Sequence, residues 1–294
     1  MNKQLMQKYA DFAVKVGVNV QPGQNFIIQC PVEGAEFARA CAKAGFEAGA
    51  KRVEVRYSDE QVSRLQMEHT SLETLCDVKP WQLRSYLDYA EEEGSVCILN
   101  IHAADPEIYK GLDGGKIQQA ALARRAALKA WQEYTMNSLI QWCIVAIPTE
   151  AWAQKIFPGC SGEEAVEKLW QAIFQVCRVT EDTDPVEAWR EHVAKMAARR
   201  DRMNQLDLVS LHLVGENGTD LTIGLAEDAV WEGASEAAHN NGVEFIANIP
   251  TEEVFCAPHK DKVEGVVYGT KPYIHGGQAI KGLHVTFKGG RIVE

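Results

Sequence analysis

The hydrophobic period of the sequence changes near residue 204, and this change limits the possible folds more than any other feature. Before it, short apolar runs typical of buried strands alternate with apolar residues at helical spacing, the pattern of βα units on a parallel sheet. After it, apolar and polar residues alternate at every second position, and glycine becomes frequent. We therefore predict an α/β domain with a mainly parallel sheet over residues 1–204, followed by a β-rich, antiparallel domain over residues 205–294.

The first domain is expected to contain a βαβ unit. Apolar runs predict strands at four places: Phe26–Cys30, Arg52–Tyr57, Ser95–Ile101 and Leu139–Ile147. Between the first two, one helix face is formed by four apolar residues at spacings of four, three and four, namely Phe37, Cys41, Ala44 and Ala48. Two further apolar stripes predict helices over residues 166–177 and 186–196.

The second domain carries hairpin signals. An Asn-Gly pair at residues 217–218 separates two alternating runs, and such a pair is a strong sign of a tight turn. Further alternating faces occur at Val243–Ile249 and at Leu283–Phe287, and the Gly-Gly pair at 289–290 predicts a turn into a return strand over 291–294. Because a natural domain seldom ends inside such a strand, we expect the sequence to stop within a domain.

Composition excludes several classes of partner. The chain has 30 Lys and Arg against 41 Asp and Glu, a net charge of −11, which argues against nucleic acid and against acidic membrane surfaces. Its eight cysteines lie at least 11 residues apart, so no CxxC pair indicates a zinc knuckle or a redox site. No run approaches the roughly 20 apolar residues of a membrane span. We expect a soluble protein of the reducing cytoplasm.

The common catalytic motifs are absent. The sequence has no HExxH, no GxSxG and no GxxxxGKS/T, so zincin, serine-hydrolase and P-loop interpretations have no support. A lone Gly34 follows the first predicted strand and leaves a nucleotide site open as a weak alternative. The eight histidines show no i, i+3 or i, i+4 spacing and are predicted to be structural.

The segment that stands out is Asn248–Pro258, in which two adjacent carboxylates lie between prolines. If the segment is extended, Glu252 and Glu253 point to opposite faces, so one faces solvent and the other faces apolar neighbours. A carboxylate in a partly apolar site ionises when it is paired or bound to a cation. From these residues alone, a metal site and an ordinary surface ion pair are both open.

This segment resembles the signature of the bacterial metallo-aminopeptidase family that includes aminopeptidase T and aminopeptidase S, the thermophilic-type leucyl aminopeptidases. Similar blocks occur in the same order along the whole chain, at Pro31–Glu33, Ala48–Val53, Gly218–Leu225 and Val263–Val267. The resemblance implies a metal-dependent hydrolase that releases residues from the free amino end of peptides. It places a metal ligand at Glu253, whereas Glu252 is not carried over. The remaining ligands and the catalytic residues are expected beyond residue 294.

The resemblance also implies two divalent ions, zinc, cobalt, manganese or magnesium, which activate a bridging water in the parent enzyme, and it implies a homodimer. We expect Glu253 to point toward the catalytic cleft and Glu252 away from it. Residues 1–294 alone are expected to bind no metal pair and to be inactive. The 251–259 loop should then reach solvent, and Leu283–Lys288 should form an unpaired sheet edge. A non-enzymatic α/β protein that binds a small molecule and a nucleotide-dependent enzyme are the alternatives.

Overall fold

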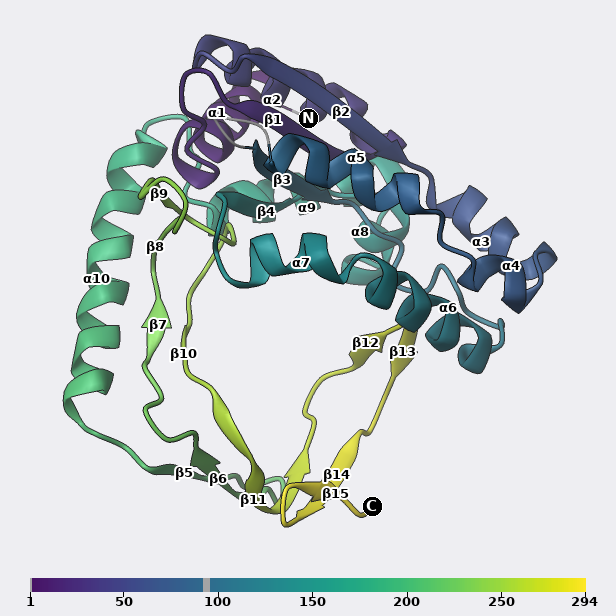
Figure 1. Ribbon diagram of the computed structural model, residues 1–294, viewed down its shortest axis with the longest axis vertical. Coiled ribbons are helices and arrows are strands. Elements are labelled where there is room, and N and C mark those ends of the chain that lie inside the picture. Colours follow the sequence, from purple (N-terminus) through teal and green to yellow (C-terminus); the bar gives the residue numbers. More distant parts are fainter. Residues whose placement is uncertain (1, 92–95) are drawn as a thin grey trace. The chain divides into compact units, whose positions relative to one another are not determined.

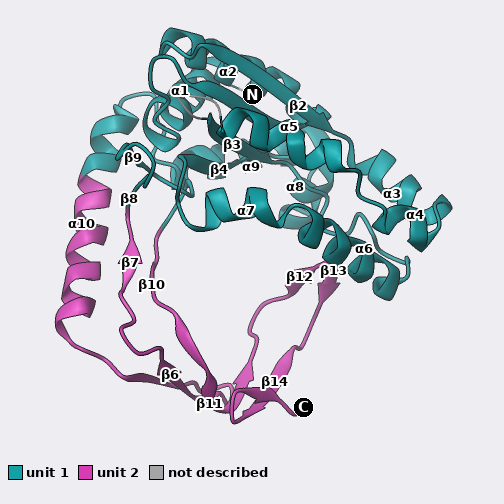
Figure 2. Cartoon of the chain, in the orientation of Figure 1, with its two compact units in different colours: residues 1–190, 235–251 teal, residues 191–234, 252–294 magenta. Residues whose placement is uncertain are grey.

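The computed structural model describes residues 2–91 and 96–294. The chain forms two compact units, one of residues 1–190 and 235–251 and one of residues 191–234 and 252–294 (Figure 2). The change from helices to strands expected near residue 204 coincides with the end of helix α10 (Pro185–Gln205). The compact units divide at a different place, within α10, and residues 235–251 belong with the first unit.

The first unit is built on a four-stranded parallel sheet, which confirms the predicted fold class. Its strands are β1 (Asn25–Pro31), β2 (Arg52–Ser58), β3 (Val96–His102) and β4 (Trp142–Ala146), in the spatial order β2-β1-β3-β4 (Figure 1). These are the four predicted strands, although Ser95 lies outside the described residues. Because β2 lies on one side of β1 and β3 on the other, the strand order reverses between β1 and β3.

One layer of helices covers the sheet face that carries Phe26. Gly45 of α2 (Ala35–Glu47) packs so closely on the Phe26 ring that a Cβ there would lie 2.6 Å from it. The rings of Tyr9 and Phe37, 5.1 Å apart, join α1 to α2. Besides α2, the elements of this part are α1 (Lys3–Phe12), the π-helical turn η1 (Ala13–Gly17), the 3-10 turn η2 (Val32–Gly34), α8 (Glu150–Ile156) and α9 (Gly162–Val176).

The opposite sheet face carries Ile27 and Ile98, which are buried in a cluster with Trp131. Burying one such aliphatic side chain contributes about 1.5–3 kcal/mol, so a shift of one residue along a strand would be costly. The Tyr86 and Trp131 rings stack at 4.8 Å and connect two helices over this cluster. The helices between β2 and β4 are α3 (Glu60–His69), α4 (Leu72–Cys76), α5 (Pro80–Ala90), α6 (Gly114–Ala127) and α7 (Lys129–Met136).

Residues 235–251 run along the β4 edge of this sheet. The Ile144 N–H donates to the Ala247 carbonyl at 2.8 Å, and the Ile249 N–H donates to the Ile144 carbonyl at 2.9 Å. Only a short β9 (Glu244–Phe245) forms from the alternating run at 243–249, and it pairs with β8 (Glu236–Ala237). The alternation predicted a strand of the antiparallel domain; the structure corrects this, because backbone hydrogen bonds attach the run to the parallel sheet.

The second unit contains the predicted antiparallel sheet. Gly218 (φ +92°) turns the chain from β5 to β6, as the Asn-Gly pair indicated. β14 pairs with β11 on one side, and on the other side its Phe287 and Lys288 pair with β15, so the unpaired edge expected at Leu283–Lys288 is wrong for this end of the strand. The sheet has the order β15-β14-β11-β6-β5, with β5 (Ser210–Val214), β6 (Asp220–Leu225), β11 (Pro258–Tyr268), β14 (His284–Lys288) and β15 (Arg291–Ile292). Two short pairs complete this unit: β7 (Glu232–Gly233) with β10 (Val254–Phe255), and β12 (Tyr273–His275) with β13 (Gln278–Ile280).

The cysteines behave as small apolar side chains. All eight are free thiols, and Cys30, Cys41, Cys97, Cys143 and Cys177 are buried. Burial raises the pKa of Cys30 and that of Cys177 to about 12, so both thiols stay protonated. Within residues 2–91 and 96–294, no helix is both long enough and apolar enough to span a membrane.

Candidate metal-binding segment

Glu252 and Glu253 lie immediately before β10, which pairs with β7 through Val254 and Gly233. Gly233 has a φ of +139°, and a Cβ on it would lie 2.7 Å from the Glu253 carbonyl oxygen. Only glycine adopts this conformation and permits this approach without strain. Gly233 therefore lets the chain pass closely beside the backbone of the candidate ligand.

Both carboxylates of the segment reach solvent, Glu252 with 59% of its side-chain area. Within the part of the chain that the structure describes, the Glu253 carboxylate has neither a hydrogen-bond donor nor an ion-pair partner. The expected enclosure of one of them by apolar neighbours is therefore not found. The exposure of Glu252 and Glu253 agrees with the expectation that the 251–259 loop reaches solvent in residues 1–294 alone. A solvated carboxylate without a protein partner is free to take a cation.

Sequence reasoning missed a contact of Glu252. The Nε2 atom of His192 lies 3.7 Å from the Glu252 carboxylate, and the His192 side chain is only 8% exposed. Trp189, His192 and Met196 follow one another at spacings of three and four along α10, and all three are buried. The helical period could therefore have placed His192 on the buried stripe, but nothing local in the sequence connects it to Glu252.

The donor set of this segment is too small for a two-metal centre. Such a centre needs several carboxylate and imidazole donors to replace the water bound to the ions. Among residues 2–91 and 96–294, no group of three or more His, Cys, Asp or Glu side chains is placed to hold a metal ion. Glu253 and the pair Glu252–His192 do not by themselves fit the metal pair that the resemblance implies.

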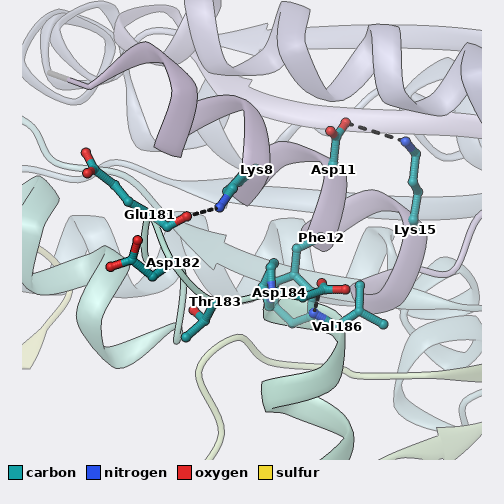
Figure 3. A pocket seen from close by; sticks show the side chains of 10 residues that line it. Lys8, Asp11, Phe12, Lys15, Glu181, Asp182, Thr183, Asp184 and Val186 are labelled. Carbon is teal, nitrogen blue, oxygen red and sulfur yellow. Dashed lines mark hydrogen bonds and ion pairs between the residues drawn. The ribbon is translucent and has the colours of Figure 1, made fainter.

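A cavity of about 410 Å³ in the first unit is also lined by several acidic side chains, and some of its charged groups make contacts (Figure 3). The Lys8 Nζ donates to the carbonyl oxygens of Thr180 and Glu181 at 3.0 and 2.7 Å. Asp11 pairs with Lys15 at 3.7 Å. The cavity is lined by the end of α1, the start of α10 and the acidic run 181–184. These carboxylates do not converge on one point, so this cavity is not the missing metal site.

A smaller hollow of about 220 Å³ lies at the carboxyl ends of β1 and β3. Cys30, which lines the hollow, contacts Gly34, the glycine that left a nucleotide site open in the sequence. Gly34 packs against the strands, because a Cβ on it would lie 2.6 Å from both the Cys30 Sγ and the Ile147 Cδ1. Among the residues that the structure describes, no Lys or Arg lines the hollow. Close packing thus accounts for Gly34, and the described lining offers no lysine or arginine to a phosphate.

Comparisons with known proteins support the resemblance found in the sequence. The profile of the thermophilic metalloprotease (M29) family matches residues 2–294. Aminopeptidase AmpS of Bacillus subtilis (strain 168) is 38% identical over 291 residues, which are 99% of this chain and 70% of that protein. Aminopeptidase T of Thermus aquaticus is 38% identical over 293 residues, 98% of this chain and 70% of that protein.

A solved structure, wild-type AmpT from Thermus thermophilus, has the same fold with a TM-score of 0.88. It is 33% identical in sequence, and the match covers 100% of this chain and 71% of that one. Sequence and structure therefore agree over nearly the whole length of the chain. The protein belongs to the thermophilic metalloprotease (M29) family.

Proposed function

We propose that this protein is a metal-dependent aminopeptidase that acts on peptides in the cytoplasm. The observation that carries the proposal is the match over nearly the whole chain to relatives that are named aminopeptidases, together with the shared fold. The acidic balance of the chain supports it, because a net charge of −11 suits divalent cations better than polyanions.

Glu253 is the residue that we assign to metal binding. Its carboxylate is exposed and has no partner in the described part of the chain, so binding a cation would not require breaking a protein contact. Glu252 already has a neighbour in His192, 3.7 Å away, and is the weaker choice. An ionised carboxylate is a common ligand of zinc, cobalt, manganese and magnesium, and any of these is compatible with the assignment.

The reaction uses two divalent ions, as the family resemblance implies, but residues 1–294 do not hold them on their own. No cluster of three donor side chains occurs among the described residues. We therefore place the remaining ligands and the catalytic groups outside residues 1–294, and we expect these residues alone to be inactive. The active enzyme is proposed to be a homodimer.

Hydrolysis of an aminoacyl reporter tests the proposal. The protein expressed from its complete gene is stripped of metal with a chelator, assayed, and reconstituted in turn with zinc, cobalt, manganese and magnesium. Residues 1–294 are assayed in parallel. Turnover should require metal and a free amino end and should be absent from residues 1–294. Metal-independent turnover, or cleavage of an amino-blocked reporter at the same rate, would exclude this function.

A further inference from the structure

The hollow at the carboxyl ends of the parallel strands has the position of a ligand site. In open α/β sheets, ligands bind outside the carboxyl ends of the strands where the strand order reverses. Here that point lies between β1 and β3, and the hollow is lined by the last residues of both strands, by Ser58 at the end of β2 and by Glu60 at the start of α3. All of these residues belong to the first unit.

Polar groups without protein partners line this hollow. Gln29 on β1 and Asn100 on β3 are register neighbours, so their half-buried side chains project from the same face of the sheet. In the described part of the chain, neither side-chain amide takes part in a hydrogen bond, and the same holds for the Ser58 hydroxyl. Adjacent amides at the end of a buried sheet can donate to a carboxylate, and they have no other acceptor here.

One carboxylate gives the hollow its charge. The Glu60 Oε2 accepts the Asp105 backbone N–H at 2.8 Å, whereas its other oxygen has no partner among the described residues. Burial raises the pKa of Glu60, and the charges of Asp105 and Glu33 raise it further. A positively charged ligand would relieve both effects, because it would pair with the carboxylate that burial and its neighbours destabilise.

Lysine and arginine side chains of the described residues do not pair with the Glu60 carboxylate. No Lys or Arg of residues 2–91 and 96–294 lines the hollow. Arg56 is the register neighbour of Gln29 on β2, but its guanidinium donates to Glu54 and to the Ser85 carbonyl, both at 2.6 Å. A phosphate would therefore meet the Glu60 carboxylate, with the His102 imidazole as the one basic side chain among the described lining residues, whereas an ammonium group would pair with that carboxylate.

We propose that this hollow binds a free α-amino acid, with the ammonium group at the Glu60 carboxylate and the carboxylate group at the side-chain amides of Gln29 and Asn100. The volume of about 220 Å³ equals that of roughly seven water molecules, which suits a molecule of amino-acid size and is too small for a dinucleotide. The choice of an amino acid among small zwitterions rests on the proposed function, because an aminopeptidase releases free amino acids.

Isothermal titration calorimetry on the purified protein tests the two halves of the ligand separately. L-leucine is compared with 3-methylbutylamine, which lacks the carboxylate, and with 4-methylpentanoate, which lacks the ammonium group. Leucine should bind, and each analogue should bind at least about tenfold more weakly, a loss of roughly 1.4 kcal/mol or more.

Two variants test the orientation. Glu60→Gln keeps an oxygen for the Asp105 N–H but removes the charge, so leucine and the amine should both lose affinity. Asn100→Asp places a negative charge beside the ligand carboxylate, so leucine affinity should fall while amine affinity is kept or increased. Glu163→Gln is the matched control, because Glu163 is an exposed glutamate in the first turn of another helix of the same unit. It should bind all three probes as the wild type does.

Absence of leucine binding at millimolar concentration, or equal leucine affinity in the wild type and Glu60→Gln, would overturn the proposal. Binding of adenosine monophosphate that Glu60→Gln abolishes would overturn it in favour of a nucleotide site. The aminoacyl reporter assay, run on the protein from the complete gene, separates this proposal from the proposed function. If leucine binds but the protein has no peptidase activity, the proposed aminopeptidase function is wrong and the amino-acid site stands. If the protein is active but leucine does not bind, the amino-acid site is wrong and the proposed function stands.

Discussion

Replacing Gln141 tests how residues 235–251 are held to the rest of the first unit. Its side chain is fully buried, and its Oε1 accepts the amides of Gln24 and Asn241 at 2.8 and 2.9 Å. Its Nε2 donates to the Asn19 carbonyl at 3.0 Å. This one amide therefore connects the loop before β1, the start of β4 and the returning segment.

Replacing Gln141 with Leu removes these bonds at nearly constant volume. Asn241 is exposed, so its amide can bond to water instead, and the Asn19 carbonyl keeps the hydrogen bond from Gln21. Neither residue therefore adds much to the loss of unfolding free energy. The buried Gln24 amide loses its hydrogen bond to Gln141, and one such bond contributes about 0.5–1.5 kcal/mol to stability. We expect the unfolding free energy of the first unit to fall by that amount.

Chemical denaturation followed by tryptophan fluorescence measures this loss, and hydrogen exchange at the Ile246 and Ile249 amides should quicken. Gln171→Leu on the exposed face of α9 is the control, with an expected change within about 0.5 kcal/mol. In the Gln24→Leu/Gln141→Leu double variant, the loss should be smaller than the sum of the single losses. An unchanged midpoint and unchanged exchange in Gln141→Leu would refute the anchoring role.

Three further predictions follow from individual residues. Burial raises the folded-state pKa of Glu60, so the ionised form of this side chain destabilises the fold. Glu60→Gln should therefore have a higher melting temperature than the wild type at pH 7, and the difference should disappear as the pH falls through that pKa. Gly265→Ala should cost at least about 1–3 kcal/mol in thermal unfolding, because Gly265 has a φ of +112° and a Cβ would lie 2.1 Å from the Asp220 carbonyl oxygen; Gly159→Ala, with open space around it, is the control. An aromatic disulfide reagent at pH 8 should titrate at most three of the eight thiols, those of Cys76, Cys160 and Cys256, before denaturant exposes the rest.

The centre of the parallel sheet was predictable because β1 and β3 are buried on both faces. Phe26–Cys30 and Ser95–Ile101 read as continuous apolar runs, and short runs of this kind occur where helices cover both sides of a sheet. The Asn-Gly pair at 217–218 was equally informative, since its backbone preference is local. Local signals of this kind depend on neighbouring residues alone.

Contacts between distant parts of the chain could not be predicted. The run at 243–249 alternates as a strand of the second domain would, but its backbone pairs with Ile144, and no local pattern specifies that partner. The approach of His192 to Glu252 and the hollow formed by Gln29 and Asn100 depend on tertiary packing in the same way. Glu253 itself was proposed from family resemblance rather than from local chemistry.

Metal content and turnover of the Glu253→Gln variant test the central claim most directly. The variant is made in the protein expressed from the complete gene, beside the wild type and Glu252→Gln, and each is assayed by elemental analysis and with a leucine reporter. The amide keeps the shape of the side chain but removes the charge that binds the ion. We predict that Glu253→Gln loses bound metal and metal-dependent turnover, whereas Glu252→Gln retains both; full metal content and wild-type turnover in Glu253→Gln would contradict the account.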